Sequence, residues 1–334
     1  MKKHICKVIL LAILILTSCD DEIYETHEGN YERFSTQSIG LFDTAISFMA
    51  YAETREDFNH YTEVLFNKLE ELHKVFTIFE PHPNNLYMLN AGHTIEASEV
   101  LISLLQIGKE AYEISGGRLN IAIGPITNIW SNQRNSASPA LPSLEELQEA
   151  ANYIDIEGII IEDGTVRLNN PNMKLDVGTI GKAYAMVHAT NHLIEQTGIS
   201  SFLLSVGGDI IAHNAPLSNR ETWVVGIEDP DNPNNPAIRA VNVVNTAFFA
   251  SGDYRRFFTV GDVRFSHIID PETLFPANYF KSVNVIHEDA IMAEILTTAL
   301  FLMPIEEAQE MANYYNARVL WIDLEGNIIT TPDF

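Results

Sequence analysis

The chain has 334 residues, enough for one large domain or two modest ones with a substantial core. Hydrophobic residues make up 46% and charged residues 19%, and these ordinary proportions exclude extensive disorder. The formal net charge of −25 argues against nucleic acid as a partner, because a strongly acidic surface repels the phosphate backbone.

The N-terminal residues predict an export signal. Lys2, Lys3 and Lys7 give a positive start, residues 8–16 are continuously apolar, and small residues precede Cys19. The apolar run has about half of the ~20 residues that a membrane-spanning helix needs. Its Leu-Thr-Ser-Cys ending resembles the lipobox of bacterial lipoproteins, in which the cysteine becomes the first mature residue and carries lipid. A plain signal peptide with an incidental cysteine is the alternative.

We therefore expect a lipoprotein signal peptide over 1–18, a flexible tether over 19–38 and a folded domain over 39–334. The lipid would hold this domain at the cell membrane, facing outside the cytoplasm. Cys6 would be removed with the signal and Cys19 would be acylated, which leaves no thiol in the mature domain. Cysteine nucleophiles, cysteine zinc sites and disulfides are thereby excluded.

Hydrophobic periodicity beyond the tether predicts a mixture of helices and strands. Helical spacing and capping signals predict helices over 55–79, 98–114, 178–196, 292–303 and 305–314, with a short one after Ser143. Short apolar or alternating runs predict strands over 44–51, 159–161, 166–168, 202–206, 223–227, 240–245, 283–286, 319–322 and 328–331. Because these strands do not alternate regularly with helices, the expected fold class is α+β rather than a doubly wound sheet.

A glycine-rich segment over 175–185 places Asp176 and Lys182 at a predicted strand-to-helix junction. Glycines let the backbone approach a ligand closely, and a helix N-terminus attracts anions, so Lys182 could face a phosphate. The segment lacks the spacing of a P-loop or of a dinucleotide-binding turn. A simple glycine-rich helix start remains the alternative.

Two further turns follow apolar strands, at 206–209 and 250–256. Their glycines could present backbone amides next to Asp209, Ser251 and Asp253, although plain turns explain them equally well.

His267 is predicted to lie on a strand that ends in Asp-Pro, where a neutral imidazole could accept a hydroxyl proton. A lone histidine is more often structural. Glu294 and Thr298 are four residues apart on a predicted helix and share one face. A carboxylate and a hydroxyl are hard oxygen ligands suited to Mg²⁺, and an ordinary hydrogen bond between them is the alternative.

The order of these motifs resembles the ApbE family of FAD:protein FMN transferases. The resemblance also includes Phe42-Asp43-Thr44 as the family's first strand, 85–92 as its substrate-covering loop and 119–130 as its central strand. It covers about residues 40–331.

The resemblance implies an α+β fold related to the T-fold, with a mainly antiparallel sheet, flanking helices and a flavin cleft between two lobes. It implies an enzyme that binds FAD as substrate, with Mg²⁺ on the diphosphate. A Thr or Ser hydroxyl of an exported or membrane-associated acceptor protein would attack the FMN phosphorus, and AMP would leave.

Site residues follow from the same resemblance, position by position. His267 would be the general base, and the Thr179 carbonyl, Glu294 and Thr298 would ligate Mg²⁺. The flavin nucleotide would be bound by Phe42, Phe79, Asn120, Ile121, Ala122, Asp176, Lys182, Gly207, Gly208, Asp209, Ser251, Gly252, Asp253 and Ile269.

Two positions depart from the family pattern. Glu294 stands where the family usually has Asp, and its extra methylene could weaken metal binding or change the ion, because Mg²⁺ tolerates distorted geometry poorly. Leu274 stands where the family has Gly, which would alter a turn beside the base.

Two other functions use the same site. Water could replace the acceptor, giving an FAD pyrophosphatase that releases FMN and AMP. Alternatively, the chain could be a non-catalytic flavin-binding lipoprotein.

Overall fold

The computed structural model describes residues 24–26, 29–232, 235 and 237–334. The predicted signal peptide and Cys19 lie outside the described residues. Within them, none of the helices combines the length and the apolar character needed to span a bilayer.

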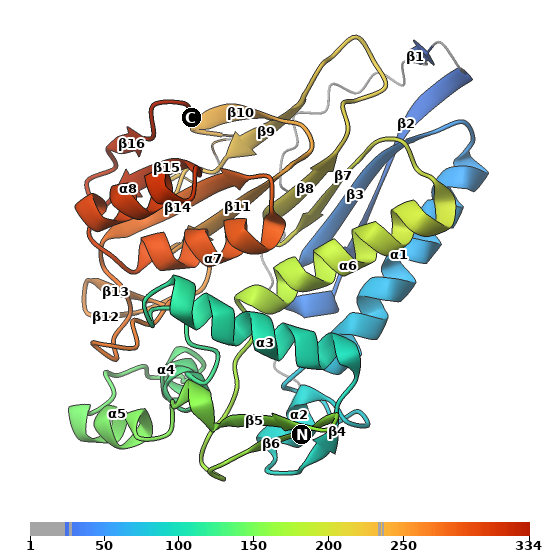
Figure 1. Ribbon diagram of the computed structural model, residues 1–334. Helices are drawn as coiled ribbons and strands as arrows, with labels where there is room; N and C mark the ends of the chain where they lie inside the picture. Colours follow the sequence, from blue (N-terminus) through green and yellow to red (C-terminus); the bar gives the residue numbers. More distant parts are fainter. Residues whose placement is uncertain (1–23, 27–28, 233–234, 236) are drawn as a thin grey trace.

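A large antiparallel sheet forms the body of the molecule (Figure 1). In the described part of the chain it contains nine strands, and every neighbouring pair is antiparallel. In spatial order they are β1 (Tyr24–Thr26), β2 (Gly29–Ile39), β3 (Ala45–Ala52), β7 (Phe202–Val206), β8 (Asp209–His213), β11 (Thr246–Gly252), β14 (Phe280–His287), β15 (Arg318–Asp323) and β16 (Ile328–Thr330). The prediction of an α+β fold with a mainly antiparallel sheet is confirmed.

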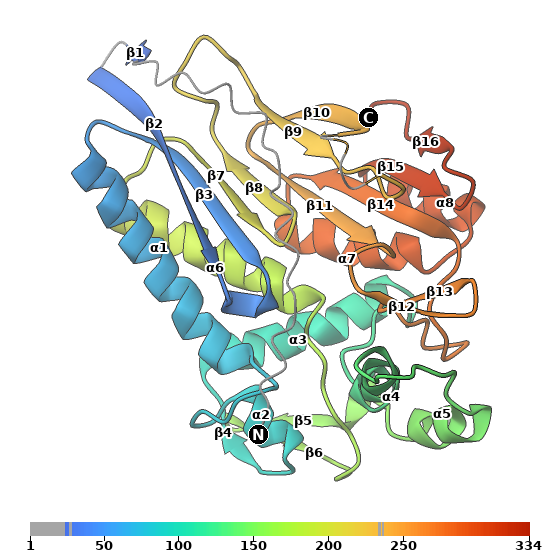
Figure 2. The same ribbon diagram turned by 180° about the vertical axis from the view of Figure 1, so that it is seen from behind.

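Helices cover one face of this sheet (Figure 1): α1 (Arg55–Phe76), α6 (Ile180–Thr197), α7 (Ala290–Phe301) and α8 (Ile305–Tyr314). Amphipathic spacing explains α1, whose buried residues recur along one stripe from Phe58 to Phe76. The hairpin of β9 (Trp223–Ile227) and β10 (Arg239–Val243) covers part of the other face (Figure 2). Successive residues of β3 point to opposite faces of the sheet. Phe48 packs in the main core on the helix side, whereas Met49 packs in the core under this hairpin.

Smaller elements lie below the sheet (Figure 1). One group comprises α2 (Leu86–Asn90), α3 (Glu99–Ile114) and a three-stranded sheet of β4 (Ile95–Glu96), β6 (Thr165–Leu168) and β5 (Ile159–Glu162). A second group comprises α4 (Gly124–Arg134), α5 (Leu144–Ala151), β12 (Phe257–Val260) and β13 (Val263–Ser266) around Trp130. Two short 3-10 turns, η1 (Leu41–Asp43) and η2 (Ile156–Gly158), complete the described elements.

The prediction of a tether over 19–38 is wrong for residues 29–38. These residues form most of β2, which pairs with β3 from Glu32 opposite Ala52 to Ile39 opposite Ala45. Phe34 is buried, and its ring lies 5.4 Å from that of Phe58. The strand is polar because it lies near the sheet edge with much of its surface exposed, and this composition resembles that of a linker.

The prediction of a central strand over 119–130 is also wrong. The Asn120 side chain accepts a hydrogen bond from the Ala122 amide at 2.8 Å, which turns the chain. Pro125 then lies in the first turn of α4, where its fixed φ and missing amide hydrogen are favourable. Only Ile123 makes a strand-like bridge, to Lys174.

Candidate active site

Lys182 and Asp209 form a buried ion pair between the first turn of α6 and the start of β8. The second Asp209 oxygen accepts a hydrogen bond from the Ala250 amide at 3.3 Å. Burial acts to lower the pKa of Lys182, but the Asp209 and Glu294 carboxylates outweigh it, so the pKa is raised and the ammonium stays charged.

The tight turn between β7 and β8 delivers Asp209 to this position. Gly207 and Gly208 have φ of 67° and 105°, a region that glycine adopts without strain. A Cβ at Gly207 would lie 2.7 Å from the Thr44 hydroxyl oxygen, so the turn also packs too closely on the chain before β3 for any side chain.

Glu294 lies on α7 with only 4% of its surface exposed. Its Oε2 atom is buried and has no hydrogen-bond partner among the described residues. Burial raises the pKa of this carboxyl to about 8, Lys182 opposes the rise and Asp209 adds to it. An unpaired buried carboxylate is costly, and a bound cation would remove that cost.

Thr298 follows one turn later on α7 and is also buried. The intervening Thr297 hydroxyl is already used, because it accepts from the Ser251 amide at 3.0 Å and donates to the Val283 carbonyl at 3.1 Å. Thr297 therefore joins α7 to the sheet, and its hydroxyl is not free for a ligand.

His267 lies in the bend after β13, not on the strand as predicted, because the ladder ends at Ser266. Its Nδ1 atom is buried without a partner in the described structure. Burial, followed by the positive charges of Arg256, Arg134 and Lys182, lowers the pKa of the imidazole to about 3. The ring is therefore neutral at physiological pH and has a free nitrogen.

Two arginines beside His267, Arg134 and Arg256, were not among the predicted site residues. Arg134 ends α4, a helix that the sequence patterns did not predict. Arg256 stands in the Tyr-x-Arg part of the 250–256 segment, and this motif was the one signal that could have identified it.

Asp176 has a structural role in the segment before α6. Its carboxylate accepts from the Gly178 amide at 2.9 Å and from the Thr127 hydroxyl at 3.0 Å. Its own amide donates to the Ile121 carbonyl at 2.8 Å, which joins this segment to the Asn120–Ala122 turn. Thr179 is the N-cap of α6 but makes no side-chain capping bond.

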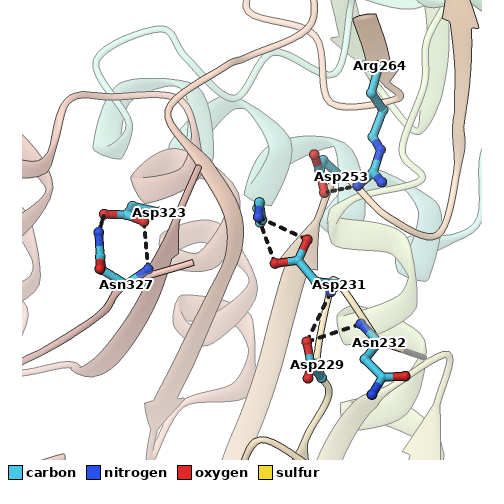
Figure 3. Close-up of polar contacts among 8 residues, drawn as sticks. Asp229, Asp231, Asn232, Asp253, Arg264, Asp323 and Asn327 are labelled. Atoms are coloured by element: carbon cyan, nitrogen blue, oxygen red, sulfur yellow. Dashed lines mark hydrogen bonds and ion pairs between the residues drawn. The ribbon is translucent and has the colours of Figure 1, made fainter. Parts of the chain in front are cut away.

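Other predicted residues do not converge on this group. Phe79 is 69% exposed, and Phe42 packs edge-on against His73 with ring centroids 5.2 Å apart. Asp253 is paired with Arg264 at 3.1 Å, as Figure 3 shows. The Ile269 side chain is buried in the core around Trp130.

Leu274 lies at a turn whose backbone conformation favours glycine. Leu274 has φ of 66°, a left-handed conformation that costs a non-glycine residue about 1–2 kcal/mol. Its side chain is buried near Trp130, whose indole nitrogen donates to the Leu274 carbonyl at 2.9 Å. Its burial and this hydrogen bond hold the turn in its left-handed conformation.

The donor set fits a hard cation. The described residues contain no group of three or more His, Cys, Asp or Glu side chains arranged around a metal position. The predicted set draws on only one such residue, together with a hydroxyl and a backbone carbonyl. The unpaired Glu294 oxygen is the observation that supports it.

Comparison with known proteins identifies the family of this chain. A sequence model of the ApbE family matches residues 42–321. The chain belongs to the ApbE family. FAD:protein FMN transferase of Vibrio cholerae is 27% identical over 322 residues, covering 94% of this chain and 92% of that protein. The enzyme of the same name from Haemophilus influenzae is 24% identical and covers 96% and 93%.

Solved structures show the same fold. The ApbE protein of Thermotoga maritima superposes with a TM-score of 0.81 at 24% identity, covering 90% of this chain and 98% of that one. The flavin transferase ApbE from Vibrio cholerae gives 0.77 at 23% identity, covering 91% and 98%. At such identities these superpositions establish the fold of this ApbE chain and not its activity.

Proposed function

We propose that this ApbE chain transfers FMN from FAD to a Thr or Ser hydroxyl of an exported acceptor protein, with Mg²⁺, and releases AMP. The full-length relatives that carry the name FAD:protein FMN transferase support the reaction. The structural observation that carries it is the neutral His267 imidazole beside Arg134, Arg256 and the Lys182 ammonium, with the unpaired carboxylate of Glu294 next to Lys182.

The Thr179 carbonyl, Glu294 and Thr298 would hold the metal ion. Bound Mg²⁺ neutralises diphosphate charge and so lowers the barrier to attack on phosphorus.

The residues of this chain handle the proton and the remaining charge. His267 accepts the proton of the acceptor hydroxyl, whose oxygen forms the new bond to the FMN phosphorus. The bond from that phosphorus to the AMP oxygen breaks, and AMP leaves with the electron pair. Lys182 adds fixed positive charge, which favours the increasingly charged transition state.

The finer features of the fold belong to the same proposal. A relation to the T-fold and a flavin cleft between two lobes are supported by the order of the motifs, which resembles that of the family. Phe42, Gly207, Gly208, Ser251 and Gly252 would then shape the flavin and phosphate walls through backbone and ring contacts.

A two-part assay tests the reaction. FAD and Mg²⁺ are incubated with and without a candidate exported acceptor, and flavin fluorescence on the denatured acceptor, free FMN and AMP are measured. We expect bound flavin and AMP in equal amounts only with the acceptor. Free FMN without an acceptor would instead establish the pyrophosphatase, and absence of AMP in both arms would establish a flavin-binding protein.

Histidine variants test the proposed base. His267→Ala should lose transfer by several orders of magnitude and still bind FAD. His213→Ala is the matched control, since His213 is another half-buried imidazole with a lowered pKa, stacked on Phe202 at 5.0 Å. Equal transfer by the wild type and His267→Ala would refute the role of His267.

A further inference from the structure

Arg134 and Arg256 make no ion pair with a carboxylate in the described part of the chain. Arg134 donates to the Ser131 hydroxyl at 3.2 Å, and Arg256 donates to the Asp43 carbonyl at 3.4 Å. The chain has 45 acidic and 20 basic residues, so carboxylates are abundant. The neighbouring Arg255, in contrast, is paired with Glu228 at 3.0 Å.

The two guanidinium groups act on the same imidazole. Both lower the pKa of His267 after the larger effect of burial, and Lys182 contributes in the same direction. Burial and then the charge of Arg256 lower the pKa of Arg134, which only Asp176 opposes. Three positive charges from α4, the β11–β12 connection and α6 thus lie near His267. Asp209 is paired with Lys182 and Asp176 acts on Arg134, so the charge of Arg256 is the least compensated of the three.

The backbone segment that accepts the hydrogen bond of the Arg256 side chain has an unusual conformation. Its acceptor, Asp43, and the preceding Phe42 both have φ of 52°, in the left-handed region. Strain of this kind is retained where the surrounding structure fixes a residue for a purpose. Here it places the Asp43 carbonyl where it can orient the Arg256 guanidinium.

Guanidinium groups bind phosphate with two parallel hydrogen bonds, which suits an anion with several equivalent oxygens. Lys182 is already engaged with Asp209, so Arg134 and Arg256 provide the positive charge that remains free for a ligand. A metal at Glu294 and two arginines at His267 would then contact a diphosphate from two sides.

We propose that Arg134 and Arg256 form a phosphate clamp that binds the nucleotide phosphates on the His267 side of the site. Its role in transfer rests on the proposed function. In that reaction the clamp would stabilise the negative charge that develops on the AMP oxygen as its bond to the FMN phosphorus breaks. Binding of the nucleotide itself requires neither transfer nor an acceptor.

Calorimetric titration with ADP, AMP and adenosine, without acceptor and with Mg²⁺, tests the clamp. Arg134→Ala and Arg256→Ala should each weaken ADP binding roughly tenfold or more, because each removes charge-assisted hydrogen bonds. Binding of uncharged adenosine should not change. Arg134→Lys and Arg256→Lys should keep part of the affinity for ADP, because lysine supplies the positive charge but not the two parallel N–H donors of a guanidinium group.

Arg264→Ala is the matched control, because Arg264 is an arginine of the adjacent β13 with a carboxylate partner, Asp253. It should bind ADP like the wild type. Loss of affinity for ADP alone would place the clamp on the phosphate nearer to FMN, and loss for both ADP and AMP would place it on the adenylate phosphate. Either result supports the clamp.

Unchanged affinity of both Ala variants for ADP and AMP would overturn it, as would an equal loss of adenosine binding. The outcome is separate from that of the transfer assay. If no acceptor ever receives FMN but ADP binding falls as expected, the clamp stands and the proposed reaction does not.

Discussion

The Glu294 carboxyl changes its charge with pH in a range where few carboxyls do. In the unfolded chain it titrates near 4.5, whereas burial in the folded protein raises its pKa to about 8. Between these values the folded state holds one more proton than the unfolded state. The free energy of unfolding therefore falls as pH rises through this window, by an amount on the order of a few kcal/mol in the absence of metal.

Glu294→Gln should remove this pH dependence, because an amide has nearly the same shape and no titration. In metal-free buffer, we expect the Tm of the variant to exceed that of the wild type by a margin that grows from about pH 5 to about pH 8. Differential scanning calorimetry across this range provides the measurement.

Mg²⁺ gives the complementary test. A cation that binds only the folded state should raise the wild-type Tm and leave Glu294→Gln almost unchanged. Glu294→Asp, the side chain usual in the family, should retain the metal response. If the Tm of the wild type changes with neither pH nor Mg²⁺, Glu294 is not a buried titrating carboxyl and does not bind the metal.

Among the elements, β2 differs most from its prediction, and its role can be measured. It pairs along β3, and Phe34 packs against Phe58 with the Arg55 guanidinium 4.2 Å from the Phe34 ring centroid. Phe34→Ala should lower the free energy of unfolding by about 3 kcal/mol, the usual cost of deleting a buried ring. The exposed Gln37→Ala on the same strand should have little effect.

Shortened chains extend this prediction. A chain that begins at residue 29 should unfold like the mature protein, whereas one that begins at residue 40 should melt at a clearly lower temperature and expose the β3 edge. The measurement is the denaturant concentration at the unfolding midpoint of the two chains. Equal midpoints would mean that residues 29–39 are a tether after all.

Local sequence signals predicted elements well where helix caps and periodicity were strong. The helix predicted over 305–314 has the bounds of α8, and Ser143 caps α5 by accepting from the Glu146 amide at 3.1 Å. The α4 helix was missed because its apolar residues pack around Trp130 without an amphipathic stripe, and its start depends on the turn at Asn120. That turn is stabilised by a bond to Ile154, far along the chain.

At the scale of the whole molecule, motif order predicted a set of site residues but not the charge that each of them carries. Lys182, Asp209 and Glu294 come from three elements that only the sheet and its helices bring together. The neutral state of His267 depends on burial and on two arginines distant in sequence, so no local pattern could have shown it. The Asp253 carboxylate, predicted for the flavin wall, is taken by Arg264 through the pairing of β12 with β13.

The lipid anchor that the sequence predicts would confine the site to the membrane surface. Four residues separate Cys19 from β1, and a chain of that length spans at most ~18 Å, so an acylated Cys19 would keep the domain close to the membrane. Cys19→Ala should move the protein from the membrane fraction to the soluble fraction. It should leave the Tm and ADP affinity unchanged, because β2 and the site lie beyond the anchor. Transfer of FMN to a membrane-associated acceptor should fall, since the local concentration given by the shared membrane is lost. Fractionation with transfer assays on a membrane-bound and a soluble acceptor measures this effect, and a Cys19→Ala protein that remains in the membrane fraction would exclude the anchor.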